Sequence, residues 1–174
     1  GNIAIDRELG RRLRQTDALW ALLYIDMDNF KAFNDVYGFA HGDEAILLVA
    51  SSTVDAVRRR GNDADFVGHI GGDDFIVVTS PDRSEEIARE IIETFDRDIT
   101  KLYSAQDLRQ GYIETRDRRG TLNRYPIMSL SIAILSNENR TLESYAQIGE
   151  AAAELKRYAK QLGGSVFVKD KRKA

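Results

Sequence analysis

The chain has 174 residues, of which 43% are hydrophobic and 30% are charged, with a net charge of -3. This length and apolar content suit one compact domain with a buried core, and so small a net charge gives no strong field to attract nucleic acid or a membrane surface. The absence of cysteine excludes disulfides and thiolate metal sites, and two histidines are too few to favour an imidazole zinc site. We expect residues 1–174 to form a single domain, cut out of a longer chain.

The first elements predicted are a helix and a buried strand. Ile5, Leu9 and Leu13 recur at four-residue spacing among charges, which indicates an amphipathic helix over residues 4–15. The continuous apolar run over residues 19–25 is typical of a central strand that is covered on both faces. Asp26 and the two residues after it would then stand at the carboxyl end of this strand, where ligand sites of α/β sheets lie.

Two further helices follow this strand. A short helix is expected over residues 30–36, closed by Gly38, and a long helix over residues 41–60, ended by Gly61. The predicted apolar face of the long helix consists of Ile46, Val49, Ala50, Val54 and Val57.

Residues 65–79 contain two short β-branched runs on either side of Gly71-Gly72-Asp73-Asp74, which predicts a strand, a tight turn and a returning strand. Glycines in the turn can adopt positive φ and allow a ligand to approach the backbone closely. The adjacent carboxylates would be accessible to water and to a divalent cation. An ordinary hairpin turn is the alternative interpretation of this stretch taken alone.

The second half of the chain alternates helices and strands. A helix opened by Pro81 runs to about residue 102, and a projecting hairpin lies within the polar residues 104–125. A strand over residues 127–135 precedes a helix that Thr141 opens and Gly163 stops, and residues 166–168 form a short closing strand. This order predicts the α/β class, as an α+β sandwich whose central, mostly antiparallel sheet is flanked by helices and carries an inserted hairpin.

Three aspartates are the candidate chemical groups. If the first strand lies beside the hairpin, Asp26, Asp73 and Asp74 converge at one edge of the sheet. Such a cluster repels itself unless a hard cation compensates it, and Mg²⁺ takes one or two carboxylates together with substrate phosphates. This arrangement suits phosphoryl or nucleotidyl transfer. Taken singly, each aspartate is also explained as a solvated residue at a strand end.

Two stretches resemble the GGDEF domain, the family of diguanylate cyclases. They are residues 26–38, Asp-Met-Asp-Asn-Phe-Lys-Ala-Phe-Asn-Asp-Val-Tyr-Gly, continued by Gly42-Asp43, and residues 71–75, Gly-Gly-Asp-Asp-Phe. The resemblance covers nearly the whole chain. It implies a palm-like nucleotide cyclase fold and the condensation of two GTP molecules into cyclic di-GMP, a bacterial second messenger in signal transduction.

The resemblance also implies site residues. Mg²⁺ or Mn²⁺ would be held by Asp26, the carbonyl of Met27, Asp73 and Asp74, and the last two also occupy the catalytic positions that handle the 3′-hydroxyl. The substrate would be bound by Asn34 and Asp43 at the guanine, by Phe30, Lys31 and Lys160 at the phosphates, and by the backbone of Gly71 and Gly72.

The implied partners are GTP, cyclic di-GMP as product, a second copy of the chain in an active homodimer, and an N-terminal sensory or receiver domain in the full-length protein. No nucleic acid and no membrane contact by this domain are expected. No apolar run approaches the roughly 18 residues that span a bilayer, and no signal peptide is visible. The expected location is cytoplasmic.

The chain departs from the family pattern at several positions. Asp74 replaces the usual glutamate, which shortens the reach of the carboxylate by one methylene. Gly164 stands in place of a second phosphate-binding cation. Its loss weakens triphosphate binding unless Lys156 or Arg157 substitutes for that cation. Phe39 replaces a histidine and His69 an arginine. At the family's product-inhibition site, Arg-x-x-Asp, the chain has Asn62 and Asp65, so the bidentate guanidinium contact is lost.

These observations leave three functional hypotheses. The first is an active diguanylate cyclase. The second is a catalytically weak or inactive GTP-binding module that regulates an attached domain, which Asp74 and Gly164 favour. The third is nucleotidyl transfer of the polymerase or adenylyl cyclase type. Enzymes of that type use the same carboxylate chemistry but do not have the two motifs found here.

Overall fold

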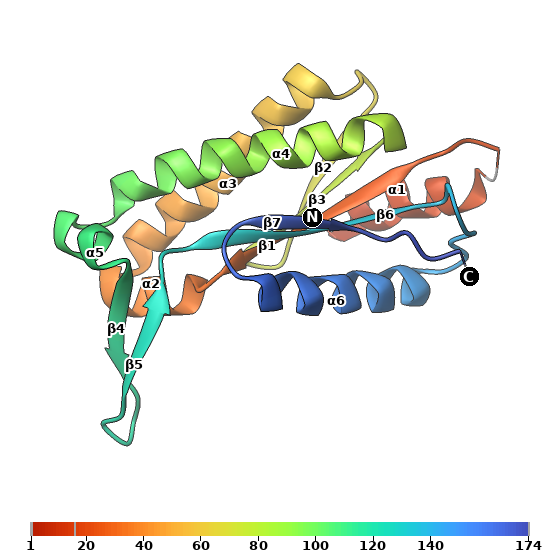
Figure 1. Ribbon diagram of the computed structural model, residues 1–174. Helices are drawn as coiled ribbons and strands as arrows, with labels where there is room; N and C mark the ends of the chain where they lie inside the picture. The colour runs from red at the N-terminus through yellow and green to blue at the C-terminus, as the bar shows by residue number, and fades with distance from the viewer. Residues whose placement is uncertain (1, 16, 174) are drawn as a thin grey trace.

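The computed structural model describes residues 2–15 and 17–173, and its centre is a five-stranded sheet with the strand order β2-β3-β1-β6-β7 (Figure 1). Neighbouring strands are antiparallel except for β6 and β7, which run parallel. The mostly antiparallel sheet expected from the sequence is therefore confirmed. The strands are β1 (Ala21–Asp28), β2 (Phe66–Ile70), β3 (Asp74–Thr79), β6 (Ser129–Ser136) and β7 (Val166–Lys169).

Helices cover both faces of the sheet (Figure 1). One face packs against α2 (Phe30–Tyr37), α3 (Phe39–Arg60) and α4 (Pro81–Asp98), and the other packs against α1 (Asn2–Arg14) and α6 (Tyr145–Leu162). Because side chains alternate along a strand, Leu23 and Ile25 of β1 enter the first core and Leu22 enters the second. Tyr24, Asp26 and Asp28 consequently lie on the α6 face.

The segment between α4 and β6 leaves the body of the molecule. It consists of η1 (Ile99–Leu102), α5 (Ala105–Gln110), β4 (Tyr112–Arg116) and β5 (Leu122–Pro126). The last two strands form the projecting hairpin that the sequence predicts (Figure 1). Helix α5 was not predicted, although Ser104 caps it by accepting a hydrogen bond from the Asp107 amide at 3.1 Å.

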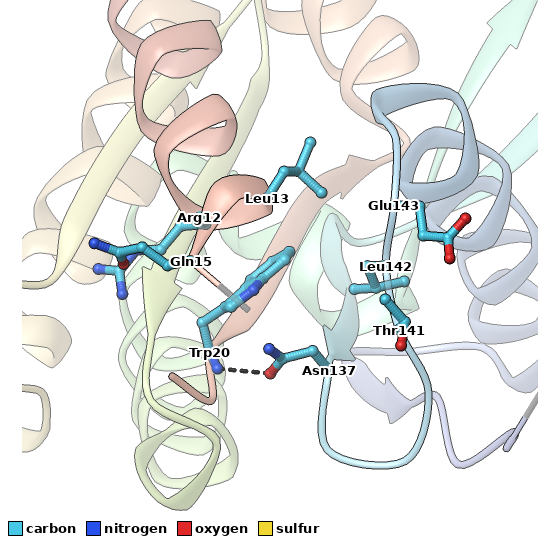
Figure 2. Close-up of a pocket in the computed structure, with 8 residues that line it drawn as sticks. All are labelled: Arg12, Leu13, Gln15, Trp20, Asn137, Thr141, Leu142 and Glu143. Atoms are coloured by element: carbon cyan, nitrogen blue, oxygen red, sulfur yellow. Dashed lines mark hydrogen bonds between the residues drawn. The ribbon is translucent and has the colours of Figure 1, made fainter. Parts of the chain in front are cut away.

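The start of β1 is anchored to the loop that precedes α6. The Trp20 amide donates to the side-chain oxygen of Asn137 at 2.8 Å, and the Asn137 amide group donates to the Ala18 carbonyl at 2.9 Å (Figure 2). A cavity of about 390 Å³ lies beside this contact, between the end of α1 and the loop. Trp20 itself is almost completely buried and closes the end of the second core.

Two predicted details are wrong. Val54 is 47% exposed, because the buried face of α3 is formed by the small residues Ala45, Ser52, Thr53 and Ala56 together with Val49. The other predicted residues of this face, Ile46, Val49, Ala50 and Val57, do pack into the core. Ser52 and Thr53 also belong to the buried face, but hydroxyl residues count as polar in a hydrophobicity pattern.

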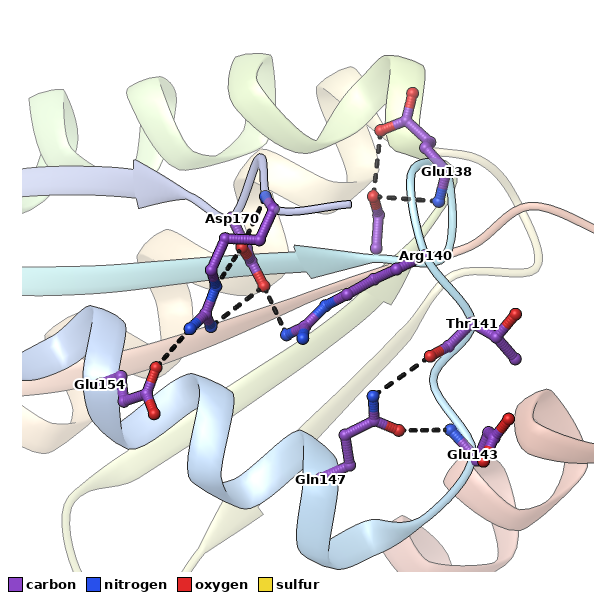
Figure 3. Close-up of polar contacts among 9 residues, drawn as sticks. Glu138, Arg140, Thr141, Glu143, Gln147, Glu154 and Asp170 are labelled. Atoms are coloured by element: carbon purple, nitrogen blue, oxygen red, sulfur yellow. Dashed lines mark hydrogen bonds and ion pairs between the residues drawn. The ribbon is translucent and has the colours of Figure 1, made fainter. Parts of the chain in front are cut away.

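The last helix begins later than predicted, at Tyr145 rather than at Thr141. Ser144 caps it through a hydrogen bond from the Gln147 amide, and the Gln147 side chain bonds the Glu143 amide and the Thr141 carbonyl (Figure 3). These bonds hold the preceding residues outside the helix. In the part of the chain that the structure describes, no helix is long and apolar enough to cross a bilayer.

Candidate functional site

The candidate site begins with two carboxylates that face each other across neighbouring strands. The register of β1 and β3 ends with Ile25 opposite Phe75, and Asp26 and Asp74 are the next residues of each strand. Ile25 and Phe75 point into the core on the α3 face. Strand alternation therefore turns Asp26 and Asp74 together toward the α6 face.

The two carboxyl groups titrate differently because they are neighbours. Burial, followed by the hydrogen bond and negative charge of Asp26, raises the pKa of Asp74 to about 6. Burial also acts to raise the pKa of Asp26, but hydrogen bonds from Asp74 and Lys160 and the positive charge of Lys160 outweigh it, so this pKa is lowered. Below about pH 6 the pair therefore carries one negative charge, on Asp26, with the proton on Asp74.

Lys160 joins the site from α6. Its ammonium group lies 2.6 Å from Asp26 Oδ2 and 2.8 Å from Asp28 Oδ1. The Asp28 carboxylate also accepts hydrogen bonds from the hydroxyl groups of Ser129 and Ser131 on β6, at 2.7 Å and 2.9 Å. Burial acts to lower the pKa of Lys160, but pairing with the two aspartates raises it, so the side chain is held as a cation.

The residues at this position fit a divalent cation. Asp74 Oδ1 is buried and, among the described residues, receives no hydrogen bond. Such an oxygen beside a second carboxylate suits a hard ion with oxygen ligands. Met27 is buried in the core, which leaves its main-chain carbonyl as the group it can offer.

The predicted convergence of three carboxylates is only partly realised. Within residues 2–15 and 17–173 there is no group of three or more His, Asp or Glu side chains that could hold one ion. Asp73 lies in the hairpin turn on the rim of the same cavity as Asp26, because β3 begins only at Asp74. Mg²⁺ requires no such trio in a protein when substrate phosphates complete its coordination.

A cavity of about 340 Å³ opens beside the carboxylates, and its lining includes Asp26, Lys31, Asp73, Tyr125 and Lys160. Helix α2 starts at this cavity directly after β1. Asn29 makes the reversal possible by adopting the left-handed conformation with φ 67°, which asparagine tolerates better than most residues. The first intrahelical bond is donated by the Phe33 amide to the Asn29 carbonyl, so the amides of Phe30, Lys31 and Ala32 remain for an anion.

Helices α2 and α3 bring Asn34 and Asp43 to the same region. A side chain on Gly42 would collide with Asn34, since its Cβ would lie 1.7 Å from Asn34 Oδ1. The same Oδ1 atom is buried and, in the described residues, has no hydrogen-bonding partner. Asp43 is exposed on the second turn of α3. A polar acceptor pair therefore stands at the helix junction.

The hairpin turn is shaped by its glycines and by His69. Gly71 adopts φ 60°, which glycine accepts without strain, and both Gly71 and Gly72 leave open space where a side chain would stand. The His69 ring stacks on Phe75 with 4.3 Å between ring centroids, and its Nε2 lies 3.1 Å from the Gly72 carbonyl oxygen. His69 thus supports the turn.

Lys156 does not reach the cavity at Gly164, the position at which the family pattern has a second phosphate-binding cation. Its ammonium group lies over the Tyr24 ring, 4.2 Å from the ring centroid, one helical turn from Lys160 on the side away from Gly164. Gly164 lines a separate cavity of about 270 Å³ together with Asp28 and Lys160.

Sequence reasoning missed three residues at the site, which are Tyr24, Asp28 as the partner of Lys160, and Tyr125. Tyr24 and Asp28 alternate with Asp26 along β1, and this alternation is the signal that could have found them. Nothing local marks Tyr125, which reaches the cavity from the projecting hairpin.

The stretch at the expected product-inhibition position forms a closed turn. Asp65 accepts hydrogen bonds from the Asn62 amide at 2.8 Å and from the Thr79 hydroxyl at 2.7 Å. The Asn62 side chain donates to Asp65 and to Ser80. The arginines before this turn are paired with acidic side chains, Arg58 with Asp55 and both Arg59 and Arg60 with Glu90.

Known proteins are similar to this chain in sequence. DgcP of Pseudomonas aeruginosa, named a diguanylate cyclase, is 34% identical over 89 residues, which is 51% of this chain and 12% of that protein. The diguanylate cyclase VdcA of Vibrio cholerae is 35% identical over 91 residues, 52% of this chain and 25% of that protein. The matched regions are thus a small part of these relatives.

Solved structures match over almost the whole chain. The GGDEF domain of YfiN, also called TpbB, from Pseudomonas aeruginosa has a TM-score of 0.67 at 24% identity and covers 98% of this chain and 95% of that one. The GGDEF domain of DgcB from Caulobacter crescentus, solved in complex with c-di-GMP, has a TM-score of 0.65 at 21% identity and covers 95% and 88%. At these identities the likeness establishes the fold.

A family match identifies the chain. A family model described as "Diguanylate cyclase, GGDEF domain" matches residues 3–164, which contain both motifs, the carboxylate pair and all of α6. The chain belongs to the GGDEF domain family of diguanylate cyclases.

Proposed function

We propose that this domain condenses two GTP molecules into cyclic di-GMP. The observation that carries the proposal is the Asp26–Asp74 pair. One buried oxygen of Asp74 has no donor among the described residues, and Asp26 lines the same cavity as the first residues of α2. Anionic oxygen ligands next to a helix N-terminus suit a metal-bound triphosphate. The family relationship supports this particular reaction, since the relatives named above are diguanylate cyclases.

Each predicted residue has a role in this proposal. Asp26, Asp73, Asp74 and the Met27 carbonyl would hold Mg²⁺ or Mn²⁺, which when bound neutralises phosphate charge and lowers the pKa of an attacking hydroxyl. The amides of Phe30 and Lys31 and the Lys31 ammonium group bind phosphate oxygens. With a cation at Asp26, the Lys160 ammonium group would be available to bind phosphate oxygens.

The guanine base is assigned to Asn34 and Asp43. A carboxylate accepts hydrogen bonds from N1–H and N2–H₂ of guanine, a donor pattern that adenine lacks. Asp43→Ala leaves these donors unpaired, at a cost of about 1–3 kcal/mol, so the preference for GTP over ATP is expected to fall about 5- to 150-fold. Calorimetric titration with both nucleotides measures it, and unchanged discrimination would contradict the assignment.

Cyclic di-GMP is two-fold symmetric, so two domains that each carry one GTP must meet in a homodimer. We place this domain in the cytoplasm, behind an N-terminal sensory or receiver domain that controls the meeting. The decisive experiment supplies the dimer directly, by fusing a parallel leucine zipper before residue 2 and incubating the protein with GTP and Mg²⁺. Mass spectrometry should detect cyclic di-GMP. GTP binding without product would favour the regulatory GTP-binding module instead.

Product inhibition at the family's usual site is not part of this proposal. Asn62 offers a short neutral amide in place of an arginine fork, and it is engaged with Asp65 and Ser80. Loss of a charge-assisted contact weakens binding about ten- to a hundredfold. Titration of cyclic di-GMP without GTP is the test. Sub-micromolar binding that Asp65→Ala removes would refute this statement.

A further inference from the structure

Tyr24 of β1 lies beside Asp74, the proposed catalytic residue at the start of β3. Its hydroxyl donates a hydrogen bond to Asp74 Oδ2 at 2.8 Å. The contact follows from the register, because Tyr24 stands opposite Ile76, and Asp74 is the diagonal neighbour two residues earlier on β3. Diagonal neighbours across antiparallel strands are within reach of an aromatic side chain.

The ring of Tyr24 is itself held in place from the opposite side. The Lys156 ammonium group packs over it at 4.2 Å from the centroid, and α6 covers this face of the sheet. A cation over an aromatic face is an attractive contact that restricts the ring. Tyr24 therefore has a fixed hydroxyl, supported by the sheet on one side and by α6 on the other.

This bond divides the Asp74 carboxylate into two oxygens with different surroundings. Oδ2 is occupied by the tyrosine hydroxyl, whereas Oδ1 is buried and has no donor among the described residues. A hydroxyl that fixes one oxygen sets the rotation of the carboxylate and so the direction of the other. Aspartate is one methylene shorter than the glutamate usual in the motif, so its carboxylate stays close to the strand, where the Tyr24 hydroxyl on the same face of the sheet contacts it.

We propose that Tyr24 is a positioning residue that orients the shortened Asp74 carboxylate so that Oδ1 meets the divalent cation and the reacting hydroxyl. The proposal rests on the proposed cyclase function for its reaction. Partners that hydrogen-bond a metal-binding carboxylate change metal affinity or activity about 10- to 100-fold when removed. Tyr24 acts through Asp74 and needs no contact with the nucleotide.

The test is Tyr24→Phe, which removes one oxygen atom and keeps the ring under Lys156. We expect the turnover number of the zipper-fused protein to fall about tenfold with less than about a twofold change in the KM for GTP. Independently of turnover, the affinity for Mn²⁺ in the presence of a non-hydrolysable GTP analogue, followed by electron paramagnetic resonance, should fall about tenfold. Tyr145→Phe is the matched control, because it removes a hydroxyl that donates to the Asp6 carbonyl at the same 2.8 Å, away from the site.

Testing Tyr24→Phe in a second protein, the Asp74→Glu variant, distinguishes a positioning role of Tyr24 from a purely structural one. In Asp74→Glu the longer side chain no longer has the geometry of the Tyr24 bond, so adding Tyr24→Phe should change Mn²⁺ affinity by less than about twofold. Equal losses in both backgrounds, or loss of thermal stability with unchanged Mn²⁺ affinity, would overturn the proposal. Wild-type protein that binds Mn²⁺ with the analogue but forms no cyclic di-GMP would refute the cyclase function and leave the affinity comparison to decide the role of Tyr24.

Discussion

Two carboxylates of this domain, Asp170 and Asp74, differ in how many of their oxygens accept hydrogen bonds. Asp170, which follows β7 at the end of the sheet where β1 begins, is 7% exposed and accepts from the Arg140 side chain at 2.7 Å and from the side chain and amide of Arg172 at 2.9 Å and 3.0 Å (Figure 3). Asp74, the first residue of β3, has a hydroxyl on one oxygen and no donor on the other among the described residues. One site is complete, whereas the other lacks a partner.

The difference separates a structural cluster from a functional one. Around Asp170, Arg172 also pairs with Glu154 of α6, so the cluster ties the C-terminal segment to the helix and to the loop containing Arg140. Around Asp74 the neighbouring group is the Asp26 carboxylate, and two like charges side by side repel each other once Asp74 loses its proton. Removing charge should therefore have opposite consequences at the two places.

The largest effect is expected for Asp74→Asn. Turnover should fall by about a thousandfold, because an amide neither balances the charge of a cation nor stabilises a developing oxyanion through it. Thermal stability of the metal-free protein should hold or rise, since one charge of a repelling pair is gone. Turnover assays and thermal unfolding without metal measure both. A variant that unfolds would show that Asp74 is structural.

A smaller change, and of a different kind, is expected for Asp170→Asn. Arg140 is largely buried, with 13% of its side chain exposed, and would lose the charge that compensates it. Breaking a buried pair by removing one partner costs about 3 kcal/mol, which denaturant unfolding would measure, whereas turnover per folded molecule should not change. Asp98→Asn is the control, because its pairs with Arg97 and Lys101 lie on the surface and are expected to add nothing measurable. Equal destabilisation by the control would remove the contrast.

The smallest effect expected is on the pH dependence of stability, to which Asp170 and Asp74 contribute with opposite sign. Burial acts to raise the pKa of Asp170, but hydrogen bonds from Arg172 and the charges of Arg140 and Arg172 outweigh it, so its pKa lies below the ordinary 3.8. Its contribution to stability is present above pH 3.8 and is lost as the pH falls through the lower folded value.

For Asp74 the sign is reversed. Its folded pKa, raised to about 6 by burial and by Asp26, means that its contribution is present below the ordinary 3.8 and is lost as the pH rises through about 6. Metal-free wild type should therefore lose stability relative to Asp74→Asn between pH 4 and pH 6, and relative to Asp170→Asn only below pH 4. Denaturant unfolding of the three proteins across this range is the measurement, and parallel pH curves would contradict the assignment.

The sequence alone predicted what depends on neighbours along the chain. Apolar runs and glycines located the strands, the Gly71–Gly72 turn and the ends of the helices, because dihedral preferences and hydrophobic periodicity are local properties. The two motif stretches located Asp26, Asp43 and Asp74 by resemblance. The same local reasoning misplaced the start of α6, because the side chain of Gln147 bonds the residues before it.

Only the tertiary structure decided which of these groups meet. The β1–β3 register sets Asp26 opposite Asp74 and makes Tyr24 its diagonal neighbour, and a shift of one residue between the strands would put Asp74 on the opposite face from Tyr24 and Asp26. Packing of α6 on the sheet places Lys160 between Asp26 and Asp28, and the projecting hairpin delivers Tyr125 to the cavity. These contacts join residues up to 134 positions apart, from Asp26 to Lys160, and a cross-strand or helix–sheet contact leaves no local signal in the chain because it is fixed by the burial of the whole core.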